Sequence, residues 1–327
     1  MVGGEKKGRF TSHPPSTIHH PPSTMSEPLA YLDGRFLPQS QARLPLHDAG
    51  FVLGATITDL CRTVRHRLYR WPDHLARFRR SCRSAHIPLP LPEGELTRVA
   101  HALVTHNAGR LRREDDLALV LLATPGPIGY YAGLPGAAGT GPVTFAMHTF
   151  PLPFARYRLL VEQGASLVIP STRHVPAVCV DPRIKQRSRL HWWLADREAH
   201  LVDPHALALL LDLEGHVTET AGANFLAVSG GVVFSPPRHS ILEGISLQMV
   251  EGLCADLGIP FEERPLAVHD CLNADEAMLA STPYCLAPVA RINSTPLRCP
   301  GPTFERLLQR WSDAIGLNIR QQILGVG

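Results

Sequence analysis

Lysine is nearly absent from this chain, and one of its few lysines lies in the segment VDPRIKQRSRLHWW, residues 180–193. The sequence contains 29 Arg but only three Lys, and the lysines other than Lys185 are Lys6 and Lys7 near the N-terminus. Arginine does not deprotonate in proteins, whereas a lysine whose pKa is lowered by burial or by a neighbouring charge becomes an amine nucleophile. The pattern therefore predicts a chemical role for Lys185, such as imine formation with a carbonyl group. The alternative is a surface lysine acquired by chance.

An imine-forming lysine predicts other residues, because the usual carbonyl partner in a resident cofactor is pyridoxal phosphate. The ring nitrogen of that cofactor needs a carboxylate to stay protonated. Its phosphate needs a helix N-terminus, hydroxyl groups and usually an arginine. The carboxylate candidate is Glu219, which follows an apolar strand in HVTETAGANF and precedes a turn of small residues. The phosphate candidates are Ile245 and Ser246 after Gly244 at a helix start, Ser281 and Thr282 at a strand end, and Arg77.

Composition narrows the class of protein that must position these groups. The chain is 44% hydrophobic and 19% charged, as in a globular protein. It contains no run of about 18 apolar residues, which argues against a membrane span. The seven cysteines are scattered and form no CxxC pair, which favours a reducing cytoplasm over a disulfide framework. The net charge is +3, and the first 24 residues supply most of it, so nucleic-acid binding is not indicated.

The sequence divides into a tail and two domains. Residues 1–24 contain HPPST twice and are rich in Pro, Ser, Thr and His, which predicts a disordered low-complexity tail and makes Met25 a candidate start. We expect a smaller N-terminal α+β domain over residues 25–150 and a larger C-terminal domain over residues 151–327. The boundary falls at the proline-marked linker near residues 149–154.

Periodicity and turn residues predict the main elements. Strand and helix signals without strict βαβ alternation indicate an α+β fold. LAYLDGRFLP predicts a hairpin around Asp33-Gly34. The segment 125–142 is dense in Gly and Pro and predicts a long loop. The predicted helices are 73–86, 93–107, 189–202 with Ser188 as N-cap, 243–258 between Gly244 and Gly258, and one through Phe304 and Trp311, and a buried strand is expected at 116–124.

These segments, taken in order, resemble the class IV aminotransferases, the pyridoxal-phosphate enzymes of fold type IV. The family includes branched-chain and D-amino-acid aminotransferases and 4-amino-4-deoxychorismate lyase. The resemblance runs from about Tyr31 to Leu317. It rests on LDGRFLP, HDAGFVLGATITDLCRT, HLARFRRS, DPRIKQRSRL, LLDLEGHVTETAGANFLAV, ILEGISLQMVEGLCADLGI and ADEAMLASTPYCLAPV.

The resemblance implies two α+β domains with the cofactor between them, and a homodimer in which a loop of the partner subunit closes each site. It implies that Lys185 forms the Schiff base and shuttles a proton. Glu219 would pair with the pyridinium nitrogen. The remaining cofactor-binding residues implied are Arg77, Ile245, Ser246, Thr282 and Arg173.

Residues near the substrate depart from the family pattern. Thr58 and Asp59 stand where many relatives have an aromatic residue and a glutamate. TPGPIGYYAG lacks the arginine of the carboxylate-binding motif of D-amino-acid aminotransferases, which leaves Tyr130 and Tyr131 as loop candidates. Arg189 matches an arginine of the lyase pattern, and Arg187 is a further carboxylate candidate.

We therefore expect an aminotransferase that acts on a small-molecule amino acid, branched-chain-like or otherwise small, and on a 2-oxo acid. No metal, nucleic-acid or membrane partner is expected. The lyase is the alternative enzyme, and a non-catalytic relative with an arginine-rich face for RNA is a third interpretation.

Overall fold

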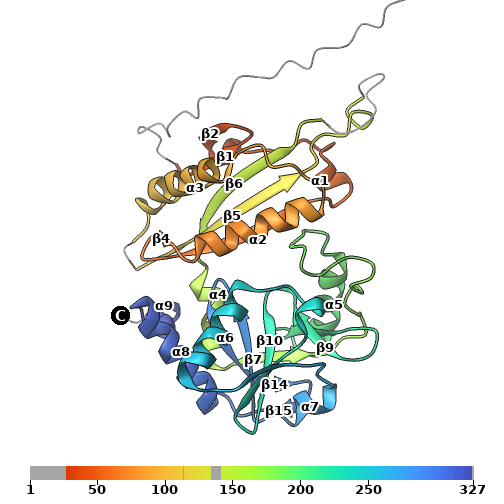
Figure 1. The fold of residues 1–327 in the computed structure, drawn as a ribbon, viewed down its shortest axis with the longest axis vertical. Coiled ribbons are helices and arrows are strands. Elements are labelled where there is room, and N and C mark those ends of the chain that lie inside the picture. Colours follow the sequence, from red (N-terminus) through yellow and green to blue (C-terminus); the bar gives the residue numbers. More distant parts are fainter. Residues whose placement is uncertain (1–26, 113, 134–140, 326–327) are drawn as a thin grey trace, which may run out of the picture.

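Two β-sheets, one from each half of the chain, form the framework of this computed structural model, which describes residues 27–112, 114–133 and 141–325 (Figure 1). The low-complexity tail expected at residues 1–24 lies outside these described residues, as does part of the Gly- and Pro-rich loop. Within them, a six-stranded sheet spans residues 29–151 and a nine-stranded sheet begins at residue 165. Helices cover both sheets, so the expected α+β class is confirmed.

The N-terminal sheet is antiparallel, with strand order β2-β1-β6-β5-β3-β4. The predicted hairpin at Asp33-Gly34 is confirmed, because β1 and β2 pair directly across these two residues. Both residues have positive φ, as a tight turn of this kind requires. The strands are β1 Leu29–Leu32, β2 Arg35–Pro38, β3 Ile57–Val64, β4 Arg67–Leu68, β5 Leu117–Thr124 and β6 Thr144–Pro151.

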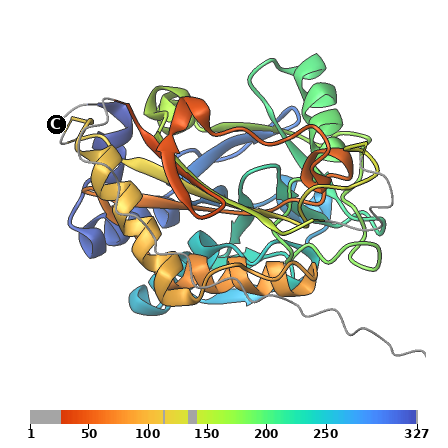
Figure 2. The ribbon, with the colours of Figure 1, turned by 90° about the horizontal axis from the view of Figure 1, so that it is seen from above.

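Two long helices cover one face of this sheet, α2 (Trp71–Ser84) and α3 (Glu93–Ala108). Figure 2 shows both on the same side of the strands. Their apolar stripes pack with alternate strand residues such as Ile57, Leu121 and Met147 into one core. Intervening residues on the other face, including Leu122 and His148, are only half-buried. Short elements elsewhere in this half are η1 Gln39–Gln41 and α1 Ala49–Val52.

In the C-terminal sheet, β9 pairs with β8 and also with β10. Strands β10, β13, β14, β7, β8 and β9 therefore form a closed ring, with parallel pairs where β7 meets β14 and β8. The closing contact places Glu219 directly opposite Asn224. The strands are β7 Ala165–Val168, β8 Leu207–Leu211, β9 Val217–Thr220, β10 Asn224–Ser229, β11 Val232–Ser235, β12 Phe261–Glu263, β13 Glu276–Ser281, β14 Cys285–Ile292 and β15 Thr295–Pro296.

Helices surround this second sheet. Helix α5 packs on one side of β8 through Ala208 and Leu210, while Leu209 joins the larger core beneath α6 and α8. The predicted glycine boundaries of α6 are confirmed, because Gly244 is its N-cap and Gly258 its left-handed C-cap. The helices are α4 Phe154–Glu162, α5 Leu190–Val202, η2 Arg238–Ser240, α6 Ile245–Leu257, α7 Val268–Leu272, α8 Pro302–Ile315 and α9 Ile319–Leu324.

One predicted cap is wrong. Helix α5 begins one residue later than expected, with Arg189 as its N-cap. The Ser188 hydroxyl donates instead to the Gly54 carbonyl, 2.7 Å away in the N-terminal half. A contact between the two halves has therefore replaced a local cap.

No helix within the described ranges is long and apolar enough to cross a membrane.

Candidate active site

Lys185 lies where the two halves of the chain meet. Its backbone N–H donates to the Ser81 hydroxyl of α2 at 3.1 Å, and its carbonyl accepts from Thr58 N of β3 at 2.9 Å. No residue of the described chain makes a hydrogen bond to its amine. Burial lowers the pKa of Lys185 to about 8, and the positive charge of Arg77 acts in the same direction. A substantial fraction of this amine is therefore neutral at mildly alkaline pH and available as a nucleophile.

Glu219 presents a fixed carboxylate from the end of β9. The side chain is buried. Its Oε2 accepts a hydrogen bond from Asn224 Nδ2 at 3.0 Å, and its Oε1 accepts from Leu242 N at 3.1 Å. His174 Nε2 lies 3.7 Å from Oε1. Three groups orient the carboxylate, and its negative charge raises the pKa of Lys185. A buried carboxylate fixed in this way is suited to hold a cationic ring nitrogen.

Arg77 is a buried cation on α2 that faces the start of α6. Its Nε and Nη2 donate to the two carboxylate oxygens of Asp59, each at 2.8 Å. Its Nη1 donates to the Glu243 carbonyl at 3.2 Å. Burial alone would raise the pKa of Asp59, but the Arg77 charge and hydrogen bonds from His74 and Arg77 outweigh it and hold that pKa far below its usual range. The guanidinium is therefore held in one orientation beside a helix N-terminus.

The start of α6 and the end of β13 border a common space. Ile245, Ser246 and Thr282 line a cavity of about 10 Å³, which is the size of one water molecule. The first N–H groups of a helix lack intrahelical acceptors and attract anions. Gly244 is required here, because a Cβ on it would lie 2.0 Å from Asn224 Oδ1. Asn224 thus ties the helix start to Glu219. A larger cavity of about 400 Å³ among Tyr31, Pro127 and Val143 is bordered by none of the predicted site residues.

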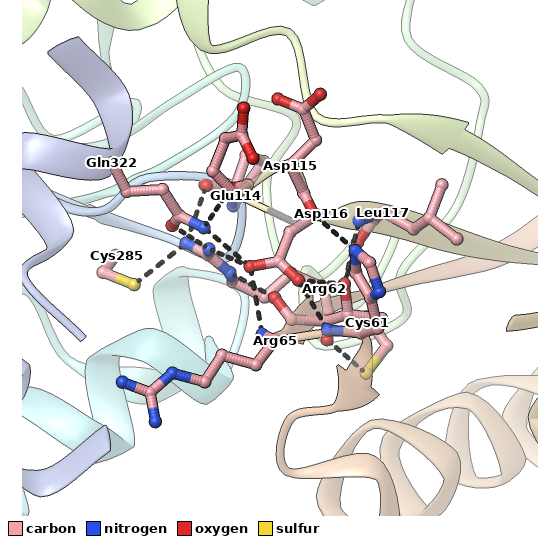
Figure 3. Close-up of polar contacts among 12 residues, drawn as sticks. Cys61, Arg62, Arg65, Glu114, Asp115, Asp116, Leu117, Cys285 and Gln322 are labelled. Atoms are coloured by element: carbon pink, nitrogen blue, oxygen red, sulfur yellow. Dashed lines mark hydrogen bonds and ion pairs between the residues drawn. The ribbon is translucent and has the colours of Figure 1, made fainter. Parts of the chain in front are cut away.

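A buried polar network fastens the two halves beside this space (Figure 3). Arg62 of β3 donates through Nη1 to the Pro283 carbonyl at 3.1 Å and to Cys285 Sγ at 3.4 Å. Its Nη2 donates to Gln322 Oε1 at 2.8 Å, and Gln322 in turn donates to Asp116 at 2.7 Å. Arg62 therefore holds the turn that directly follows Thr282.

The structure gathers most of the sequence-predicted residues around Lys185. The charges of Arg77 and Arg189 lower the pKa of the Lys185 amine, and the charge of Glu219 raises it. The Thr58 N–H donates to the Lys185 carbonyl. Ile245, Ser246 and Thr282 join through the helix start and the common cavity.

Three predicted residues lie apart from this group. The guanidinium of Arg173 donates to the carbonyls of Pro170 and Ser171 in its own loop. The next residue, His174, points toward Glu219 instead. Tyr130 and Tyr131 are exposed and pack against each other, with ring centroids 4.5 Å apart, so within this single chain they do not line the site.

Sequence reasoning missed Asn224 and His174, and it treated Asp59 only as a departure from the family pattern. Asn224 is a polar residue at the start of an apolar strand, and Asp59 is a carboxylate within one. Both were detectable as polar positions that burial would force into hydrogen bonds. Their partners come from other elements of the same half, α2 for Asp59 and β9 for Asn224, and local sequence does not specify how those elements pack.

The chain matches known proteins over most of its length. The model of the family described as "Amino-transferase class IV" matches residues 56–292. A putative branched-chain-amino-acid aminotransferase of Methanocaldococcus jannaschii is 31% identical over 80% of this chain and 87% of its own. A D-alanine aminotransferase of Staphylococcus aureus is 26% identical, covering 82% and 90%.

Solved structures share the fold. The branched-chain amino acid aminotransferase of Escherichia coli superposes with a TM-score of 0.79 at 20% identity, covering 89% of this chain and 94% of that one. The branched-chain aminotransferase of Thermoproteus uzoniensis with norvaline gives a TM-score of 0.77 at 23% identity, covering 88% and 95%.

Proposed function

Since this chain belongs to the class IV aminotransferase family, whose members depend on pyridoxal phosphate, we propose that Lys185 is the residue to which this aminotransferase attaches that cofactor. The chemistry of the donor set fits the group. A partly neutral amine, a buried carboxylate and a cation at a helix N-terminus match an aldehyde, a ring nitrogen and a phosphate. The observation that carries the proposal is geometric. Lys185 N donates to Ser81 of α2, the helix that bears Arg77. Arg77 donates to the Glu243 carbonyl at the start of α6, and Glu219 accepts from Leu242 N one residue earlier.

In this proposal the residues bind three different parts of the cofactor. Arg77, Ile245, Ser246 and Thr282 would hold the phosphate, and Glu219 would keep the ring nitrogen protonated. When bound, the cofactor supplies an electron sink for cleavage of the Cα–H bond of the substrate. The Lys185 amine would take the proton from Cα of the substrate and deliver it to the cofactor carbon.

We propose that the substrates are an amino acid, branched-chain-like or otherwise small, and a 2-oxo acid. The names of the relatives include both branched-chain and D-alanine aminotransferases, so donors of both chiralities need testing. A single amino acid without acceptor should bleach the near-visible absorbance of the coloured enzyme. Addition of a 2-oxo acid should restore it, with ping-pong steady-state kinetics.

Elimination of pyruvate from 4-amino-4-deoxychorismate is the second candidate, and it rests on Arg189, whose charge acts on Lys185. If no L- or D-amino acid bleaches the colour while that substrate yields pyruvate, the lyase proposal replaces the first.

A second copy of this chain is the proposed partner, because exposed apolar residues gather on adjoining segments. The loop after β5 joins the segment before α1 through Ile128 N and His47 O at 2.8 Å, and α1 adjoins the start of α5 through Gly54 and Ser188. Helices α1 and α5 lie on the same side of the molecule (Figure 1). Large apolar side chains exposed there are Leu46, Phe51, Leu53, Tyr130, Tyr131, Leu190 and Trp193.

Sedimentation velocity tests the dimer. We expect the mass of two chains, and we expect Trp193→Glu to give monomers because a charge in an apolar interface is costly. Leu213→Glu, at an exposed turn between β8 and β9, is the matched control. A wild-type monomer at micromolar concentration would contradict the proposal.

A reducing compartment such as the cytoplasm is the proposed setting. All seven cysteines are unpaired, and five of them are buried, which supports this proposal.

A further inference from the structure

Gln322 of α9 bridges two buried charges of the N-terminal half (Figure 3). Its Nε2 donates to Asp116 Oδ2 at 2.7 Å, and its Oε1 accepts from Arg62 Nη2 at 2.8 Å. Both charged residues are 1% exposed, and Arg62 Nη2 lies 3.6 Å from Asp116 Oδ2. A side-chain amide carries both a donor and an acceptor, so it satisfies both charges. A carboxylate at this position would repel Asp116, and an ammonium group would repel Arg62.

The helix that carries Gln322 belongs to the C-terminal half. Ile319 and Ile323 of α9 are buried in the core of that half, and α9 packs against α4. The two hydrogen bonds of the Gln322 side chain therefore tie the last helix of the described chain to the sheet of the other half.

The N-terminal half fixes Asp116 more firmly than it fixes the end of the Arg62 side chain. Asp116 accepts from Thr63 Oγ1 at 2.6 Å and from His66 N at 3.0 Å. Within its own half, the Arg62 guanidinium donates only through Nε, to the Thr63 carbonyl at 3.0 Å. A separation of 3.6 Å is too long for a direct hydrogen bond between Arg62 and Asp116, yet buried opposite charges attract strongly. Loss of the Gln322 amide would therefore draw the guanidinium toward Asp116 and away from its other partners.

The other partners of Arg62 belong to a strained turn. Residues 282–284 connect β13 to β14, and Cys285, the first residue of β14, has a φ of 63°. A residue with a side chain rarely adopts this left-handed conformation, which persists where surrounding contacts enforce it. Arg62 Nη1 supplies two such contacts, to the Pro283 carbonyl at 3.1 Å and to Cys285 Sγ at 3.4 Å. Arg62 and Thr282, the first residue of the turn, both line the cavity at the start of α6.

These contacts give Gln322 a role at a distance from the cavity. Resting on the proposed function, in which Thr282 binds the cofactor phosphate, we propose that Gln322 is a positioning residue for that phosphate site. Gln322 keeps the Arg62 guanidinium apart from Asp116, and Arg62 in turn fixes the turn that carries Thr282. The C-terminal helix thereby sets how tightly the site holds a phosphate group.

Fluorescence titration of the full-length protein, stripped of cofactor, tests this role with pyridoxal phosphate and with pyridoxal, which has no phosphate. Gln322→Leu removes both hydrogen bonds and keeps a side chain of similar volume. It should raise the Kd for pyridoxal phosphate by about 3- to 10-fold, the typical effect of one lost hydrogen bond, and leave the Kd for pyridoxal unchanged. Gln321→Leu is the matched control, because Gln321 is exposed on the same helix and its side chain makes no hydrogen bond to a described residue.

A double variant tests the spacing of the two charges. Asp116→Asn, added to Gln322→Leu, removes the charge that would draw Arg62 from the turn, so affinity for pyridoxal phosphate should recover. A general loss of packing at α9 would instead deepen with the second substitution and weaken the binding of both ligands.

The outcomes separate this inference from the proposed function. A wild-type protein that binds pyridoxal phosphate no more tightly than pyridoxal defeats the proposed phosphate site. If the wild type prefers pyridoxal phosphate and Gln322→Leu keeps that preference in full, or weakens both ligands equally, the positioning role of Gln322 is wrong. Lack of recovery in a folded double variant overturns the spacing of Arg62 and Asp116 as its cause. The single variant decides the assignment even where the double variant fails to fold.

Discussion

Asp59 and Arg77 form a two-point ion pair inside the protein, with Nε and Nη2 of the arginine each 2.8 Å from a carboxylate oxygen of the aspartate. Both side chains are buried, and His74 Nδ1 lies 2.9 Å from Asp59 Oδ1. The pair uses two of the donor nitrogens of Arg77 and leaves Nη1 directed toward the start of α6. Asp59 therefore orients the arginine that we propose binds the cofactor phosphate.

Asp59→Asn should weaken binding of pyridoxal phosphate more than binding of pyridoxal, which has no phosphate. The neutral amide keeps the shape but releases the guanidinium fork, and a lost charge-assisted contact typically costs about 1.5–3 kcal/mol. Fluorescence titration of the apoprotein with both ligands measures the difference. Asp181→Asn, which also removes the partner of an arginine, is the control. Equal weakening of both ligands would mean that Asp59 does not act through the phosphate.

Glu219→Gln should leave cofactor affinity nearly unchanged and slow the chemical step. The amide keeps one acceptor oxygen, enough for either Asn224 Nδ2 or Leu242 N, and it does not hold a ring nitrogen protonated. Stopped-flow absorbance of the first half-reaction measures the rate. A rate equal to that of wild type would exclude the ring-nitrogen role of this carboxylate.

The lowered pKa of Lys185 predicts a pH-dependent stability difference in the apoprotein. Below pH 8 the lysine is charged in both the folded and unfolded states, so folding carries the full cost of burying its charge. Between pH 8 and the ordinary value of 10.5 the unfolded chain binds the proton more tightly, so stability rises with pH. Lys185→Met removes this dependence. Melting temperatures should therefore show the variant most stabilised relative to wild type below pH 8, with the gap closing toward pH 10. A gap independent of pH would place the lysine pKa near its ordinary value.

Local patterns predicted the elements of the fold well, because their signals are short-range. Gly244 and Gly258 bound α6, and the alternation around Asp33-Gly34 gives the hairpin. Where a partner came from the other half of the chain, local reasoning failed. Ser188 makes a contact with Gly54 in place of the expected cap.

In the candidate site, too, a local sequence signal was detectable, whereas contacts between separate elements were not. Lys185 was detectable because it is the sole lysine after residue 7, a property of composition. Asn224 reaches Glu219 only because β9 closes against β10, and that register is set by the whole ring of strands. Arg173 contacts carbonyls of its own loop, while His174 Nε2 lies 3.7 Å from Glu219 Oε1.

Borohydride reduction followed by peptide mass mapping tests the central claim most directly. Purified protein loaded with pyridoxal phosphate should be yellow, and reduction should leave the cofactor covalently attached to Lys185. Lys185→Arg keeps the charge but loses the amine nucleophile, so it should take up no reducible label and show no turnover. Attachment of the cofactor to Lys6 or Lys7 with Lys185 unmodified would contradict the account.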